Sequence, residues 1–178
     1  MADIFEKRMT GELRRDFVLF LIGMRFNCLW KLHKWLPMVR SMPRMIRELA
    51  LDREFGFLGY EMWFGRTTIM VQYWRTFEQL EDYAKKKSAE HLPAWAAFNR
   101  NLGSNGDVGI WHETFLVREG AYECVYNNMP RFGLAKAGEH MPATGKRRTA
   151  AGRIGMTGVD DAPIDISGKI PGLKQTGS

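Results

Sequence analysis

The chain has 178 residues, which suits one domain with a terminal extension. Hydrophobic residues make up 45% of the chain, which is enough for a globular core. The formal net charge is +6, but Lys and Arg are scattered, which favours a solvated basic surface over a nucleic-acid or anionic-membrane site.

The two cysteines, Cys28 and Cys124, lie far apart and show no metal-binding spacing. We therefore expect free thiols in a reducing compartment. The apolar run from Phe17 to Met24 is much shorter than the roughly 20 residues of a membrane span. No cleavable signal sequence is evident, so a cytoplasmic protein without a membrane span is expected.

The first structural elements follow a polar N-terminal arm at residues 1–16. The run Phe17–Asn27 predicts a strand that is apolar on both alternating faces. Residues 28–52 predict helix, and Ser41 and Pro43 predict a kink or a break within it. The apolar face of this region is Trp35, Val39, Met42, Ile46 and Leu49.

A hairpin and a second helical region come next. Phe57–Gly65 and Thr67–Trp74 predict two antiparallel strands joined by a short turn. Thr76 and Gln79 have the form of a capping box at the start of a helix. The helical region that follows carries His91 and Trp95, which adjoin on one helix face.

A fourth strand is predicted at Val108–Val117, and it carries His112. These elements define a domain at residues 17–135. Residues 136–178 are predicted to be a flexible, Gly-rich basic tail, because such a composition buries too little apolar surface to offset its ordering entropy.

The order β-α-β-β-α-β predicts an α+β fold of the ferredoxin-like type, with a four-stranded antiparallel sheet. Helices can cover only one face of this sheet, yet its strands are apolar on both. A homodimer with sheets packed face to face is the simplest way to cover the second face.

Three segments carry a resemblance to known proteins: FGFLGYEMW, MVQYWRTFEQLEDYAKKKSAEHLPAW and VGIWHETF. Together they resemble the dimeric α+β barrel superfamily, which includes antibiotic-biosynthesis monooxygenases and haem-degrading monooxygenases. GDVGIWHETF and GAYECVYNNMPRFGL are similar to an uncharacterised monooxygenase-like domain family, also likened to haem aldoxime dehydratases. The resemblance covers about residues 15–135.

The resemblance implies an oxidoreductase that acts on a small apolar or aromatic substrate in an aromatic-lined pocket. It implies either no cofactor or haem, and no nucleic-acid partner follows from it. In haem-degrading relatives a helix His ligates iron beside a Trp and an Asn, and His91, Trp95 and Asn27 are the matching residue types. A haem-binding dehydratase-like enzyme and a non-enzymatic dimeric ligand-binding protein remain alternatives.

The residues themselves suggest further site candidates, each with a structural alternative. His112 lies in an apolar strand and could take a proton or ligate haem, or simply be hydrogen-bonded inside the protein. Arg25 and Glu61 could pair across the sheet or orient a substrate. Aromatic residues that could wall a cavity, or serve only as core, are Tyr60, Trp63, Tyr73 and Trp74.

Overall fold

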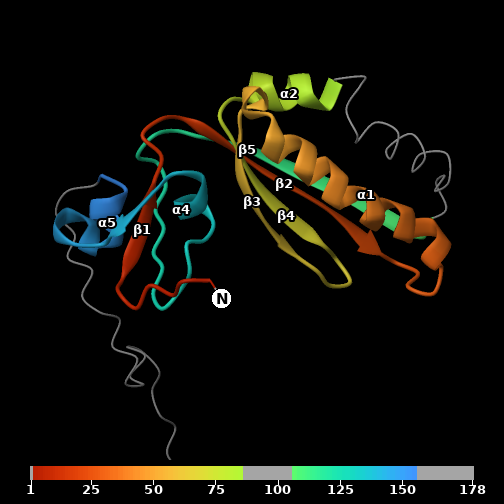
Figure 1. The fold of residues 1–178 in the computed structure, drawn as a ribbon, viewed down its shortest axis with the longest axis horizontal. Helices are drawn as coiled ribbons and strands as arrows, with labels where there is room; N and C mark the ends of the chain where they lie inside the picture. The colour runs from red at the N-terminus through yellow and green to blue at the C-terminus, as the bar shows by residue number, and fades with distance from the viewer. Residues whose placement is uncertain (1, 86–105, 156–178) are drawn as a thin grey trace, which may run out of the picture.

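A computed structural model describes residues 2–85 and 106–155 of the chain (Figure 1). The strands are β1 (Met9–Glu12), β2 (Phe17–Phe26), β3 (Phe57–Trp63), β4 (Ile69–Trp74), β5 (Val108–Val117) and β6 (Glu139–Pro142). The helices are α1 (Leu32–Leu51), α2 (Phe77–Lys85), α4 (Leu134–Ala137) and α5 (Ala150–Arg153), with 3-10 turns η1 (Arg53–Phe55) and η2 (Gly145–Arg148).

The central sheet has four antiparallel strands in the order β3-β4-β2-β5. Each of these strands lies where the sequence predicts one, and the β3–β4 hairpin is confirmed. The α+β class is confirmed, and this strand order is compatible with a ferredoxin-like split βαβ arrangement. A second, two-stranded sheet pairs β1 with β6, which adds two strands to the expected order.

One face of the central sheet is covered by α1 and α2, which lie along it in Figure 1. Trp74 of β4 is only 1% exposed and forms the centre of this core. Leu49 of α1 and the residues Leu80 and Tyr83 of α2 pack in the same cluster. This packing arises because alternate residues of each strand point to the same face, where the apolar helix faces meet them.

The opposite face is partly covered by a second layer. Leu13, which follows β1, and Leu134 of α4 pack with Phe17 at the start of β2. In Figure 1 the group formed by β1, α4 and α5 lies at this end of the sheet. The rest of this face has no cover from the described part of the chain.

Residues 139–155 are structured, in contrast to the tail that their composition predicts. Met9 of β1 lies opposite Pro142 of β6 in an antiparallel pair. Arg147 forms an ion pair with Glu12 of β1. The side chain of Arg153 is 4% exposed and lies 2.7 Å from a carboxylate oxygen of Glu123. These long-range contacts hold a polar segment that has little apolar surface of its own.

Of the kink or break predicted near Ser41, the break is wrong, because α1 runs without interruption from Leu32 to Leu51, and the kink stays a prediction. Pro37 and Pro43 both lie inside it. Each proline removes one helical hydrogen bond, but both rings are exposed, so water can reach the carbonyl groups that lose their partners. The helix therefore tolerates two prolines on its outer side.

The predicted helix start at Thr76 is confirmed, since the backbone N–H of Gln79 donates to Thr76 Oγ1 at 3.2 Å. The second half of the capping box is replaced by another contact. The side-chain amide of Gln79 donates to the carbonyl of Glu54 at 2.9 Å, which links α2 to η1. Among residues 2–85 and 106–155, no helix has the length and apolar character that crossing a membrane requires.

A close approach at Gly11 provides a test of the second layer. A Cβ at this position would lie 2.6 Å from the backbone nitrogen of Ala135 in α4. Gly11→Ala should therefore lower the free energy of unfolding by about 1–3 kcal/mol, measured by urea denaturation. Gly65→Ala is the control, because its nearest added contact is an ordinary 3.6 Å. Equal midpoints for the two variants would contradict the packing of β1 on α4.

Candidate functional site

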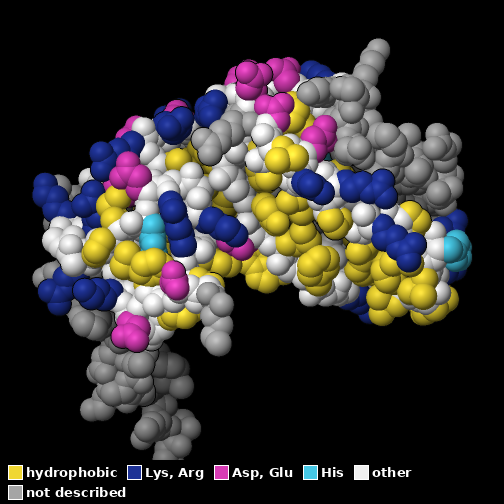
Figure 2. Space-filling model, in the orientation of Figure 1, with side chains coloured by type: hydrophobic (Ala, Val, Ile, Leu, Met, Phe, Trp, Pro, Cys, Tyr) yellow, Lys and Arg dark blue, Asp and Glu magenta, His cyan; other side chains and the backbone are white. Residues whose placement is uncertain are grey.

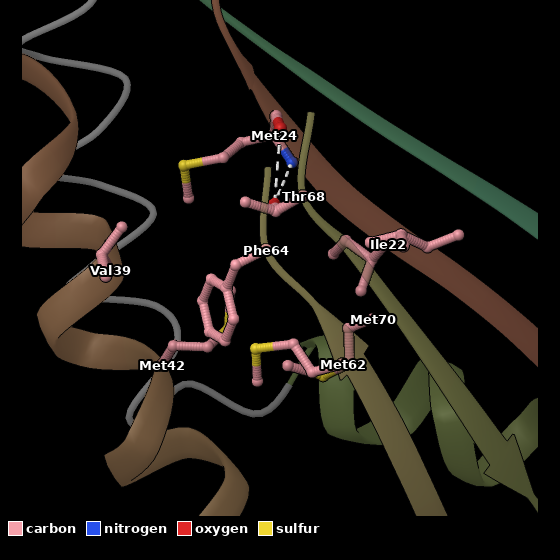
Figure 3. A pocket seen from close by; sticks show the side chains of 9 residues that line it. Ile22, Met24, Val39, Met42, Met62, Phe64, Thr68 and Met70 are labelled. Carbon is pink, nitrogen blue, oxygen red and sulfur yellow. Dashed lines mark hydrogen bonds between the residues drawn. The ribbon is translucent and has the colours of Figure 1, made fainter. Parts of the chain in front are cut away.

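An apolar recess lies between α1 and the helix-covered face of the sheet (Figure 3). We call it the Met recess, because four methionines line it. In Figure 3 Val39 and Met42 of α1 face Met62 and Phe64 across it. The lining residues are Ile22, Met24, Val39, Met42, Met62, Phe64, Thr68, Ile69 and Met70.

The walls of the Met recess favour an apolar ligand. Thr68 is the one polar side chain among the described residues that line it. Its Oγ1 accepts a hydrogen bond from the Met24 N–H at 3.0 Å and donates to the Met24 carbonyl at 3.3 Å. The hydroxyl is therefore used by the protein itself. Methionine side chains are flexible and polarizable, so these walls can adapt to aromatic or aliphatic ligands of different shapes.

His112 lies on the same sheet face as the Met recess. In the β2–β5 pairing it stands opposite Ile22, which lines the recess. Its ring centroid is 5.8 Å from that of Phe20, and its side chain is exposed at the edge of the sheet. An exposed imidazole beside an apolar recess can exchange protons with solvent and with a polar group of a bound ligand.

Trp74 and Tyr60 also lie on the helix-covered face, further along the sheet. Trp74 Nε1 donates to Gln72 Oε1 at 2.8 Å, and Gln72 Nε2 lies 3.0 Å from the sulfur of Met70. Gln72 is 7% exposed, so this chain of contacts is buried. Tyr60 stands opposite Gln72 and stacks on Phe57 with ring centroids 6.1 Å apart. Met70 lines the Met recess, so its contact with Gln72 holds this part of the wall in place.

Tyr73 and Trp63 lie on the other face of the sheet. Tyr73 packs in the second layer, where burial, followed by the charges of Cys124 and Glu61, raises its pKa to about 12. Trp63 is 44% exposed and meets the ring of Phe132 edge-on. The four predicted aromatic residues are thus divided between two faces and do not wall one cavity.

The polar candidates of the strands have local partners. Arg25 Nη1 donates to Thr67 Oγ1 at 2.9 Å. Glu61 accepts from the Gly133 N–H at 3.1 Å and lies 3.3 Å from Lys136 Nζ. The predicted Arg25–Glu61 pair is therefore wrong, although both residues share a face. Asn27 Nδ2 donates to the Gly106 carbonyl at 2.8 Å and ties the end of β2 to the segment before β5.

His91 and Trp95 lie outside the described residues. Within residues 2–85 and 106–155, no group of three or more His, Cys, Asp or Glu side chains is placed to hold a metal ion. The sequence did not predict the Met recess, because methionines are common as filling residues of a protein core. The available signal was the alternation of Met24, Met62 and Met70 on one predicted sheet face.

Comparison with known proteins gives two matches of different kinds. A family model described as Monooxygenase af470-like matches residues 17–134. The chain is also similar to Monooxygenase af470 of Aspergillus fumigatus, with 25% identity over 151 residues, covering 72% of this chain and 53% of that protein. The chain thus spans about half the length of this curated relative. No solved structure matches the chain.

The environment of Tyr73 predicts a pH dependence of stability. A tyrosine in an unfolded chain ionises near pH 10, whereas burial raises the pKa of Tyr73 to about 12 in the folded protein. Between these values the folded state holds more protons, so its stability is complete below the lower pKa and falls as pH rises through this window. Tyr73→Phe should reduce this loss in denaturation experiments across the window. An unchanged pH profile would contradict the burial of this phenol.

Proposed function

Because the chain belongs to the monooxygenase af470-like family, we propose that it is a monooxygenase-like enzyme for a small apolar or aromatic substrate. The family match over residues 17–134 carries this proposal. The Met recess supports the substrate class, since its walls are almost entirely apolar. The free space of the recess is only about 10 Å³, so a phenolic ring would enter it only as the flexible methionine side chains move aside, with its hydroxyl toward the edge strand.

The chemistry proposed for this site needs no cofactor. A phenol can give all four electrons that dioxygen takes up: one oxygen atom enters the ring, the other leaves as water with two substrate hydrogens, and a quinone results. His112 would take the proton of the phenol hydroxyl, which makes the ring a better electron donor. The apolar walls would keep bulk water from the activated ring. Tyr60, Gln72 and Trp74 would hold one wall in place and would not touch the substrate.

Substitution of His112 tests the catalytic part of the proposal. With a broad panel of apolar phenols, His112→Gln should reduce the rate of oxygen uptake about 100-fold, because general-base assistance is lost. His33→Gln is a matched control, since His33 is also exposed but lies on α1. The assay is oxygen consumption with product identification. Lack of oxygen uptake by the unaltered protein over the whole panel would overturn the proposal, and equal rates for both variants would overturn the role of His112.

Haem chemistry with an axial histidine is the competing proposal, and spectroscopy separates the two. A haem enzyme would give a Soret band with added hemin, and His112→Ala would shift that band if His112 ligates the iron. Binding of hemin with such a shift would replace the cofactor-independent mechanism.

We also propose that the open part of the second sheet face is covered by another copy of the chain. The residues that support this are Leu21, Val71, Trp63 and Phe115, which share the face that the second layer leaves partly uncovered. Trp63 and Phe115 are 44% and 46% exposed. Sheets that pack face to face bury such residues between them, and a twofold axis would bring the same surface from both chains together.

The dimer predicts a mass twice that of one chain in light scattering or sedimentation. Val71→Arg would place a charge in the centre of the open face and should shift the protein to the monomer mass. Leu51→Arg is the control, because Leu51 is 75% exposed at the end of α1, on the other side of the sheet. A monomer mass for the unaltered chain would contradict the proposal.

A further inference from the structure

Four large apolar side chains are exposed at one end of the central sheet. Trp30 is 78% exposed, Leu29 is 49% exposed and Leu32 is 52% exposed, all around the β2–α1 loop. Phe64, at the turn between β3 and β4, is 73% exposed. We call these four residues the apolar tip. A soluble protein seldom exposes several such side chains close together unless they contact a partner.

The loop and the turn are held side by side by described contacts. The backbone N–H of Phe26 donates to the carbonyl of Arg66 at 2.8 Å, which joins the end of β2 to the β3–β4 turn. The ring of Trp35 lies 4.6 Å from that of Phe26, and Trp35 Nε1 donates to the Leu29 carbonyl at 3.2 Å. The segments that carry the four residues of the apolar tip therefore lie at the same end of the sheet.

The charges around the apolar tip are almost all positive. Residues 24–40 contain no Asp or Glu, and their basic residues are Arg25, Lys31, Lys34 and Arg40. Residues 62–69 also lack acidic side chains and add Arg66. Asp107 is a nearby acid, and it is paired with Lys31 at 2.7 Å. Figure 2 shows hydrophobic side chains gathered along the lower right border of the molecule, with Lys and Arg among them.

We propose that the apolar tip docks on an anionic lipid bilayer. Trp is the side chain best suited to the boundary between headgroups and acyl chains. Leucine and phenylalanine gain free energy when they leave water for that boundary, and the surrounding cations are attracted to anionic lipids. Neither apolar burial nor charge alone gives firm binding, but the two together do.

Other occupants fit this surface less well. A second copy docked tip to tip would bring the same positive charges together, which disfavours it. A nucleic acid would match the charge and could stack on Trp30 and Phe64, but it offers nothing to the aliphatic side chains of Leu29 and Leu32. The bilayer is the partner that matches both the apolar and the basic residues.

Docking would also bring the Met recess to the membrane surface. Phe64 belongs to the apolar tip and lines the recess as well. If the recess is the substrate site, as the function proposed above requires, an apolar substrate could enter it directly from the lipid phase. The docking itself is independent of that function, because it concerns only exposed side chains.

Vesicle co-sedimentation of the full chain tests the proposal. Vesicles of phosphatidylcholine mixed with phosphatidylserine should bind the protein, vesicles of phosphatidylcholine alone should bind it much less, and high salt should weaken the binding. The double variant Trp30→Ser and Phe64→Ser should bind the mixed vesicles about tenfold more weakly. Leu51→Ser is the control, because Leu51 is equally exposed, at 75%, at the far end of α1.

Several outcomes would overturn the proposal. These are absence of binding to mixed vesicles, equal binding of the double variant and the unaltered chain, or an equal loss with Leu51→Ser. Stronger binding to a single-stranded oligonucleotide that competes with vesicles would assign the surface to nucleic acid instead. Circular dichroism checks that the variants fold, and Arg66→Gln, which changes only a charge, gives a second test with a smaller expected loss. Oxygen uptake with soluble phenols needs no vesicles, so failure here is distinguishable from failure of the proposed function.

Discussion

The structure depends on a sheet that is apolar on both of its faces. Strand β2 shows this most clearly, because Val18 points to the helices and is 3% exposed, while Phe17 points to the second layer and is 4% exposed. A strand of this kind gains stability only if both faces leave water. Two helices cover the first face fully enough to bury Trp74, but the second layer covers only one end of the other face. This unequal cover creates the surface that another chain would occupy.

The local pattern of the chain predicted the central sheet well. β2 to β5 are apolar runs of strand length that contain many β-branched and aromatic residues, so they can be predicted without knowledge of the strands they pair with. The second layer could not be found in the same way. β1 and β6 have four residues each, and Thr10 pairs with Met141 from the far side of the domain. Pairing over such a distance leaves no periodic signal in a short strand.

The difference between local sequence patterns and long-range contacts also explains the errors at the candidate site. The strand alternation could have separated Tyr73 from Trp74, because neighbours in a strand point to opposite faces. The partners of Arg25 and Glu61 could not have been predicted, since Thr67 and Lys136 reach them only after the hairpin and α4 are in place. The Met recess likewise needs α1, β2 and the hairpin together. Composition alone cannot distinguish methionines that fill a core from methionines that line an opening.

The two walls of the Met recess differ in what holds their side chains. Behind the Met recess, Gln72 links Trp74 to Met70 through buried polar contacts, so that wall is fixed. In front of it, Met42 and Val39 belong to a helix whose ends carry exposed apolar residues, and Phe64 lies at a turn. A fixed back wall with an adaptable front wall can orient an apolar ring while it still admits ligands of different outline. His112 stands opposite Ile22 with its side chain exposed, so under the proposed function its imidazole would exchange its proton with water between turnovers.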